Sequence, residues 1–374
     1  MNPSARLLVN ERANSVHRND LALPFSCDPQ QVLDFLSHCP RHQPTPLLDS
    51  RYMALQGSLE HVWIKDESSR MRLGSFKALG GIYAVARILQ NAAASSLGRT
   101  IASDELIDPE IKKLASKIRF VTASSGNHGI SVATGANLFG AQATIVLSRT
   151  VPKEFVDRLK QVPCSVIRHG EDYEQSVAHA IELSRKPGRI LLADGSWEGY
   201  MDLPGLVMEG YSVIPEECMN HFLAEDSWPT LIFLQAGVGG FAASFAAHVR
   251  AYWPVQPTII IIEPETAPCL MESVRRGRLT TVGGSISVMG RLDCKQASLI
   301  AFNTLTEVAD GFMVISDDES RLGRQSVRNA GIETTESGAA GLAGLLIALS
   351  CPDTATKIGL DTDSRCLAVV SERE

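Results

Sequence analysis

Several features that define common protein classes are missing from this sequence. No run approaches the roughly 20 consecutive apolar residues of a membrane-spanning helix. Residues 1–20 mix Arg, Glu, Asn and His and lack the apolar stretch of a secretory signal peptide. Lys and Arg number 35 against 42 Asp and Glu, and a net charge of -7 is unusual for a nucleic-acid-binding protein. We therefore expect a cytoplasmic protein with neither a membrane nor a nucleic acid as partner.

Cysteine pairs and metal-binding spacings are also lacking. Eight Cys are spread singly without a C-x-x-C pair, which excludes a disulfide scaffold and a zinc ribbon and fits a reducing compartment. Only His38 and His42 have the i, i+4 spacing of a metal-binding helix, and they bracket Pro40, which breaks a helix. We predict no metal site.

The chain does contain short apolar runs that alternate with helical patterns. Its 374 residues are 44% hydrophobic, enough for two domains or one large α/β unit. The runs fall at residues 62–64, 120–122, 143–147, 190–192, 231–234, 259–262, 312–315 and 367–370, with helices predicted at 76–90, 127–139, 173–183 and 239–253. This alternation predicts an α/β fold whose parallel sheet is covered on both faces.

A lysine at the start of a predicted helix is the first candidate for chemistry. Lys77 lies in G-S-F-K-A-L-G-G with apolar neighbours. Burial among them would lower the pKa of the amine, as Schiff-base chemistry requires. The alternative is a lysine whose apolar stem is buried while its amine reaches water.

Two loops between a strand and a helix could each hold an anion. T-A-S-S-G-N-H-G contains Ser125 and Asn127, and it could equally be an ordinary turn with a Ser cap. Q-A-G-V-G-G brings three glycines before a helix and also meets a relaxed dinucleotide fingerprint. That second loop therefore leaves an NAD-dependent dehydrogenase open, or simply tight packing of a strand against a helix.

Further polar groups follow other predicted strands. Asp194 ends residues 190–193, at the edge where ligands bind in open α/β sheets, although it could simply begin a turn. It could protonate a leaving group if the site raises its pKa. Glu336 or Ser337 could cap a small-residue helix, and Ser371 ends the last strand.

The chain resembles the fold-type II pyridoxal-phosphate (PLP) enzymes, because it carries, in this order, S-F-K, S-S-G-N-H-G, the glycine loop and E-S-G-A. That family includes threonine and serine dehydratases, serine racemase and diaminopropionate ammonia-lyase. Residues 62–68, 76–81, 197–200 and 235–239 most resemble the last group. The likeness implies a homodimer and two open, twisted, mostly parallel sheets with flanking helices. It also implies a large PLP-binding domain, residues 1–84 and 194–374, and a small inserted domain, residues 85–193.

The resemblance assigns roles to individual residues. Lys77 would be the Schiff-base lysine, Asn127 would hold the 3-hydroxyl of PLP, and Ser371 would face its pyridine nitrogen. Asp194 would be the acid for the departing β-group. The phosphate would lie against backbone N–H groups of the glycine loop: Gly237, Val238, Gly239 and Gly240.

The implied reaction is α,β-elimination, with 2,3-diaminopropionate giving pyruvate and ammonia. Ser125 stands where diaminopropionate ammonia-lyases carry Asp, and it matches the pattern of dehydratases and racemases instead. The chain also ends soon after Ser371, without the Gly-containing tail usual in the family. An L-serine or L-threonine dehydratase, with or without racemase activity, is therefore the alternative. A catalytically impaired PLP-fold protein with a binding role is a further one.

Overall fold

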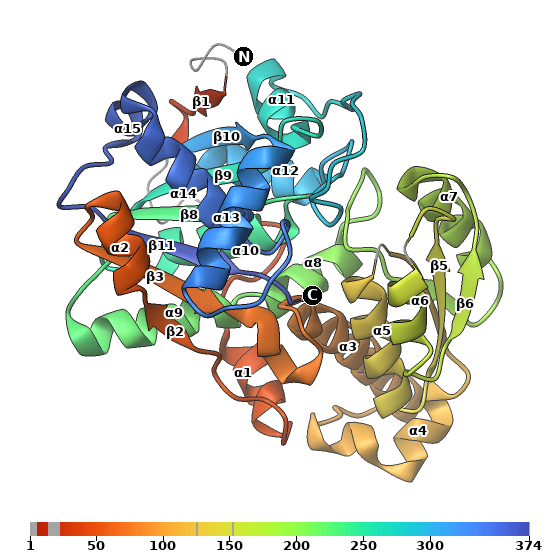
Figure 1. Ribbon diagram of the computed structural model, residues 1–374. Coiled ribbons are helices and arrows are strands. Elements are labelled where there is room, and N and C mark those ends of the chain that lie inside the picture. Colours follow the sequence, from red (N-terminus) through yellow and green to blue (C-terminus); the bar gives the residue numbers. More distant parts are fainter. Residues whose placement is uncertain (1–5, 14–22, 125, 152, 374) are drawn as a thin grey trace.

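The computed structural model describes residues 6–13, 23–124, 126–151 and 153–373. Its strands form a seven-stranded sheet and a four-stranded sheet. In Figure 1 the two sheets occupy separate parts of the molecule, and α3 (Lys77–Leu97) and α8 (Asp202–Gly210) lie between them. The predicted fold class, two mostly parallel sheets with flanking helices, is confirmed.

The larger sheet has the order β1-β10-β9-β8-β11-β3-β2. Its five inner strands are parallel, and the two edge strands, β1 and β2, pair antiparallel. The bounds are β1 Leu7–Val9, β2 Leu47–Asp49, β3 His61–Asp66, β8 Leu231–Gln235, β9 Thr258–Pro264, β10 Gly311–Ile315 and β11 Arg365–Val370. The inner strands are almost entirely buried, as expected for parallel strands covered by helices on both faces.

The smaller sheet has the order β6-β5-β4-β7, and all its pairs are parallel. Its strands are β4 Arg119–Ala123, β5 Gln142–Leu147, β6 Ser165–Arg168 and β7 Arg189–Leu191. All four strands come from the segment predicted as an inserted domain. The predicted boundary between residues 84 and 85 falls inside α3, so this helix belongs to both parts of the chain.

Helices cover both sheets. The remaining α-helices are α1 Gln30–Ser37, α2 Arg51–Gly57, α4 Pro109–Ala115, α5 Asn127–Leu138, α6 Lys153–Leu159, α7 Tyr173–Ser184, α9 Val213–Glu225, α10 Gly240–Tyr252, α11 Cys269–Arg276, α12 Leu299–Val308, α13 Asp317–Asn329, α14 Ala340–Ser350 and α15 Pro352–Ile358. Two 3-10 segments, η3 Glu67–Arg72 and η4 Asp104–Ile107, complete the described elements. Among them, no helix combines the length and apolar character needed to cross a membrane.

Close helix packing places the start of α3. An added Cβ on Gly80 would lie 2.4 Å from the Val207 carbonyl oxygen of α8, and one on Gly81 would lie 2.4 Å from the Ser131 hydroxyl of α5. Both glycines let neighbouring helices approach α3 more closely than any side chain would allow. The first residue of this tightly held helix is Lys77.

All eight predicted strands exist, whereas β1, β2 and β6 were not predicted. These three lie at sheet edges and contain only three or four residues. Their side chains are half-buried or exposed, so the sequence carries no continuous apolar run that would reveal them.

Candidate active site

Lys77 is positioned by an unusual turn. The backbone leaves β3, passes through left-handed conformations at Met71, Arg72 and Gly74, and enters α3. The Phe76 N–H donates to the Ser371 carbonyl at 3.1 Å, joining this turn to the end of β11. As a result, the lysine at the N-terminus of α3 lies beside the carboxyl edge of the large sheet.

Lys77 forms an ion pair with Asp194. The Lys77 Nζ donates to Asp194 Oδ2 at 2.6 Å, and the two side chains are 19% and 14% exposed. Burial acts to lower the pKa of Lys77, but the Asp194 carboxylate outweighs it and raises that pKa. The prediction of a lowered lysine pKa is therefore wrong, because a carboxylate distant in sequence lies against the amine.

The same pair determines the protonation of Asp194. Burial acts to raise the pKa of this carboxyl, but the charge of Lys77 holds it well below its usual value. Tyr173, the first residue of α7, donates its hydroxyl to Asp194 Oδ1 at 3.1 Å. The raised pKa that would make Asp194 an acid is therefore absent here, and both carboxylate oxygens accept hydrogen bonds.

Buried polar atoms without hydrogen-bond partners surround this pair. His128 Nε2 lies 2.9 Å from the Leu192 carbonyl, so Nε2 carries the proton and Nδ1 is left as an acceptor. Burial lowers the pKa of His128 and keeps the ring neutral. Within the described residues, His128 Nδ1, the Tyr211 hydroxyl and Gln235 Oε1 have no hydrogen-bond partner. All three residues line the same cavity as Lys77.

The glycine loop lies between β8 and α10. Gly239 has a φ of +99°, a conformation that other residues rarely adopt. An added Cβ on Gly237 would lie 2.8 Å from the Arg291 carbonyl oxygen. Because α10 begins at Gly240, its first N–H groups have no partner inside the helix and are available to an anion.

The loop before α5 combines a structural and a cavity-facing part. The Ser124 hydroxyl accepts from the N–H groups of Gly126 and Gly129, both at 2.9 Å, so this serine supports the first turn of α5, although the N-cap residue is Gly126 and not the predicted serine. Asn127 is buried, lines the cavity and donates its amide nitrogen to Glu372 Oε2. Ser125 lies outside the described residues.

One cavity unites the predicted site residues. Apart from Ser125, they all line it: Lys77, Asn127, Asp194, Gly237, Val238, Gly239, Gly240 and Ser371. Each follows the carboxyl end of a parallel strand, or begins the helix after it, which is where α/β sheets bind ligands. Sequence reasoning missed other lining residues: Tyr173, Tyr211, Arg291, Cys294 and Glu372. No motif marked them, although Glu372 directly follows Ser371.

The E-S-G-A motif does not cap a helix with a side chain. α14 begins at Ala340, and no side chain caps it, so the expected cap from Glu336 or Ser337 is wrong. The Ser337 hydroxyl instead accepts from the Arg291 N–H at 3.2 Å, and Glu336 pairs with Arg324. The motif therefore holds the backbone at Arg291 in place, in the segment 290–294 that lines the cavity.

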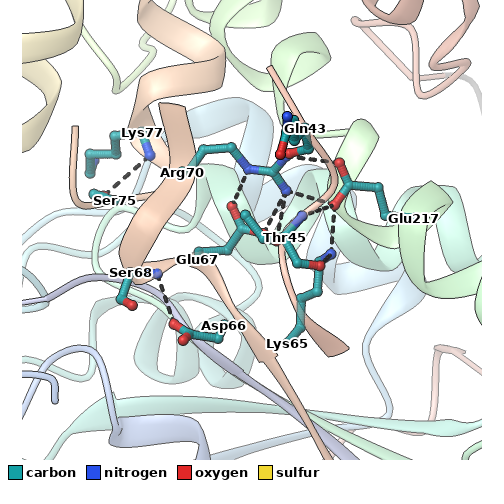
Figure 2. Close-up of polar contacts among 10 residues, drawn as sticks. All are labelled: Gln43, Thr45, Lys65, Asp66, Glu67, Ser68, Arg70, Ser75, Lys77 and Glu217. Atoms are coloured by element: carbon teal, nitrogen blue, oxygen red, sulfur yellow. Dashed lines mark hydrogen bonds and ion pairs between the residues drawn. The ribbon is translucent and has the colours of Figure 1, made fainter. Parts of the chain in front are cut away.

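A second group of buried charges joins residues that precede Lys77 in the sequence to Glu217 of α9 (Figure 2). Arg70 donates to Glu67 and Glu217, and the Lys65 Nζ donates to Glu217 at 2.5 Å. The hydroxyl of Thr45 donates to Glu67 at 2.5 Å. These residues, Thr45, Lys65, Glu67, Arg70 and Glu217, are called the β3 network below. It ties η3 to α9 and fixes the start of the turn that leads to Lys77.

The fold and the cavity together define a PLP-dependent enzyme. Residues 39–372 match the family described as "Pyridoxal-phosphate dependent enzyme", and the chain belongs to this family. The prediction of PLP as cofactor is confirmed, and the NAD-dependent alternative loses its basis.

Within this family the chain is similar to diaminopropionate ammonia-lyases. It is 29% identical to the Escherichia coli K12 protein over 341 residues, which cover 88% of this chain and 84% of that protein. It is 30% identical to the Salmonella typhimurium LT2 protein over 91% of this chain and 88% of that protein. The crystal structure of the Escherichia coli enzyme in complex with D-serine gives a TM-score of 0.87 at 26% identity, covering 98% of this chain and 93% of that one.

The cavity fits PLP on structural grounds. A lysine amine reaches into it, and at Gly237 and Gly239 an added Cβ would lie within 2.9 Å of neighbouring atoms, so the loop is restricted to glycine at these two positions. The partnerless polar atoms of His128, Tyr211 and Gln235 line the same space. Buried polar groups normally have partners, so these atoms mark a place where a polar ligand completes the structure.

Proposed function

We propose that this enzyme catalyses α,β-elimination, converting 2,3-diaminopropionate to pyruvate and ammonia. The observation that carries the proposal is the 2.6 Å contact between Lys77 Nζ and Asp194 Oδ2 beside the glycine loop. The similarity to diaminopropionate ammonia-lyases over most of the chain supports the choice of substrate.

Bound PLP would supply an electron sink for the negative charge that develops at Cα. Lys77 would hold the cofactor covalently, and Asn127 would bind its 3-hydroxyl. Ser371 would face the ring nitrogen, where a neutral hydroxyl leaves the ring unprotonated. The phosphate would meet the backbone N–H groups of the glycine loop: Gly237, Val238, Gly239 and Gly240.

Lys77 and Asp194 would move the protons of the reaction. Lys77 Nζ would take the proton from Cα of the substrate, and Asp194 would assist the departure of the β-amine. Asp194 is ionised while the Lys77 ammonium lies beside it. Once the lysine is neutral, the charge that lowers the carboxyl pKa is gone and Asp194 is able to carry a proton. Tyr173 would keep Asp194 oriented, since its hydroxyl donates to the second carboxylate oxygen.

A second activity is the elimination of water from serine or threonine. Relatives include a probable D-serine dehydratase of Rhizobium leguminosarum, 26% identical over 58% of this chain and 50% of that protein. The Haemophilus influenzae L-threonine dehydratase is 25% identical over 76% of this chain and 49% of that protein. In this alternative Asp194 would protonate a hydroxyl, and Ser125, which lies outside the described residues, would be the residue that exchanges a proton.

The substrate assignment is tested by comparing kcat/KM for the L- and D-isomers of diaminopropionate, serine and threonine, with release of the 2-oxo acid as readout. We expect one isomer of diaminopropionate to exceed every isomer of serine and threonine at least about tenfold. D194N should lower turnover about 10²-fold while cofactor binding persists, because an amide cannot transfer the proton and the residues proposed to bind the cofactor are unchanged. A higher kcat/KM for serine or threonine would contradict the assignment and support the dehydratase.

We also propose that the enzyme is a cytoplasmic homodimer with a small amino acid as substrate. The division into a large domain, residues 1–84 and 194–374, and a small domain, residues 85–193, is part of this proposal. It is supported by the four-stranded sheet, whose strands all come from the inserted segment. Light scattering coupled to size-exclusion chromatography measures the oligomeric state, and a monomeric mass would contradict the homodimer.

A further inference from the structure

Glu372 is a buried acid in the cavity wall to which nothing above assigns a role. It follows Ser371, is 3% exposed and lines the cavity. Its backbone forms an isolated antiparallel bridge with Ser75, two residues before Lys77. The backbone at Glu372 is thereby joined to the turn that leads to Lys77.

The carboxylate of Glu372 is held on several sides. The Thr335 hydroxyl donates to Oε1 at 2.6 Å, and Arg291 Nε lies 3.4 Å from the same oxygen. The Thr334 hydroxyl donates to the Glu372 backbone carbonyl at 2.5 Å. The remaining oxygen, Oε2, accepts from the Asn127 amide nitrogen. Glu372 is thus a fixed acceptor, and Asn127 is the cavity residue that uses it.

This contact determines which way the Asn127 amide faces. The amide nitrogen carries two protons and the amide oxygen carries none, so only the nitrogen can face a carboxylate favourably. On the other side, Arg158 Nη2 donates to Asn127 Oδ1 at 3.4 Å. A flipped amide would place oxygen against carboxylate and nitrogen against guanidinium. In the observed orientation, one amide proton goes to Glu372 and the second remains for a ligand in the cavity.

We propose that Glu372 is a positioning residue that sets the Asn127 amide so that its second proton meets the ring oxygen of PLP. The inference rests on the role proposed for Asn127 in cofactor binding. Without Glu372 the amide loses the acceptor that prevents its flip. The cofactor oxygen then meets an acceptor for part of the time, which weakens binding and alters the electronic environment of the ring.

The test is a double-mutant cycle in which the measured quantities are the Kd for PLP and the absorbance spectrum of the bound cofactor. The variants are N127A, E372A and the double variant, with E372Q as the conservative change and T335V as a control. T335V removes the hydrogen bond that Thr335 donates to the carboxylate and the one that it accepts from the Gly338 N–H, and it leaves the contact between Glu372 and Asn127 in place. E372Q retains an acceptor oxygen of the same reach.

We expect N127A and E372A each to raise the Kd about tenfold and to shift the absorbance maximum. The Kd of the double variant should lie within about twofold of the higher of the two single-variant Kd values. The two effects should not multiply, because Glu372 acts through Asn127. E372Q and T335V should stay within about threefold of the wild type. If E372A does not fold, the cycle is completed with E372Q, whose smaller spectral shift should vanish in the N127A background.

Two results would overturn the inference, and they are distinguishable. If the effects of N127A and E372A multiply, Glu372 does not act through Asn127, while the role of Asn127 itself survives. If N127A leaves the Kd and the spectrum unchanged, the proposed role of Asn127 fails and the role of Glu372 fails with it. Neither readout depends on the substrate, so the elimination reaction is tested separately.

Discussion

Two lysines in this molecule form ion pairs with carboxylates over almost the same N–O distance, but the surroundings of the two pairs differ. Lys65 lies 2.5 Å from Glu217, and Lys77 lies 2.6 Å from Asp194. The first pair belongs to the β3 network, where Lys65 and Glu217 are 1% and 7% exposed and Arg70 shares the carboxylate. The second pair is 19% and 14% exposed and lines a cavity.

The difference shows how a structural charge cluster is distinguished from a site. In the β3 network each charged group has several protein partners, and the network lines none of the described cavities. Around Lys77 the groups of His128, Tyr211 and Gln235 lack partners. A buried ion pair whose polar neighbours all have hydrogen-bond partners holds the fold together. An ion pair whose polar neighbours lack such partners marks a place where a ligand can bind.

The largest expected effect is on chemistry at Lys77. K77R keeps a positive charge beside Asp194, but a guanidinium cannot form a Schiff base, so turnover should fall at least about 10³-fold. K65R, the matched change in the β3 network, should keep kcat/KM within about threefold once folded. Steady-state assays and cofactor absorbance measure both variants. Comparable losses of turnover in K77R and K65R would contradict the conclusion that only the pair of Lys77 and Asp194 takes part in the chemistry.

Arg70 is expected to dominate stability rather than chemistry. R70M leaves Glu67 and Glu217 buried without their shared cation and should lower the free energy of unfolding by about 3–5 kcal/mol. R149M breaks the exposed pair with Glu171, whose side chains are 65% and 64% exposed, and should cost less than about 1 kcal/mol. Urea unfolding of the cofactor-free protein measures both, and equal losses would contradict the prediction.

The smallest expected effect comes from a buried carboxyl without a cation partner among the described residues. Glu263 accepts from the N–H groups of Leu270 and Met271, both at 2.8 Å, but burial outweighs these bonds and raises its pKa from 4.5 to about 7. Its contribution to stability is complete below pH 4.5 and is lost as pH rises through about 7, about 3 kcal/mol at most. In E263Q the free energy of unfolding, measured by urea unfolding at a series of pH values, should therefore change less between pH 4.5 and about 7 than in the wild type.

The control for this titration is E110Q, since Glu110 is exposed on α4. It should retain the slope of the wild type. If the slope survives in E263Q, another group is responsible for it. The comparison then extends to three carboxyls: cations lower the pKa of Asp194 and Glu217, whereas the fully buried Glu263 has N–H donors and no cation beside it among the described residues, and its pKa rises.

The apolar runs and the order of the motifs predicted the main strands and most of the cavity wall. This works because parallel strands end at one edge of a sheet, so residues that follow several strands meet there. Short edge strands such as β6 escaped because half-exposed residues leave no apolar run. Tyr173 and Glu372 escaped because their significance comes from contacts with Asp194 and Asn127, which the sequence does not place near them.

The sequence by itself determined the α/β alternation, the motif order and the membership of a cofactor-dependent family. Local patterns carry these properties, because strand and helix periodicity and glycine loops are encoded by neighbouring residues. Only the tertiary structure decided that Lys77 pairs with Asp194, and in which direction the pKa of this lysine moves. That direction depends on a carboxylate 117 residues away in the chain, and the folded backbone brings its oxygen to 2.6 Å from the amine.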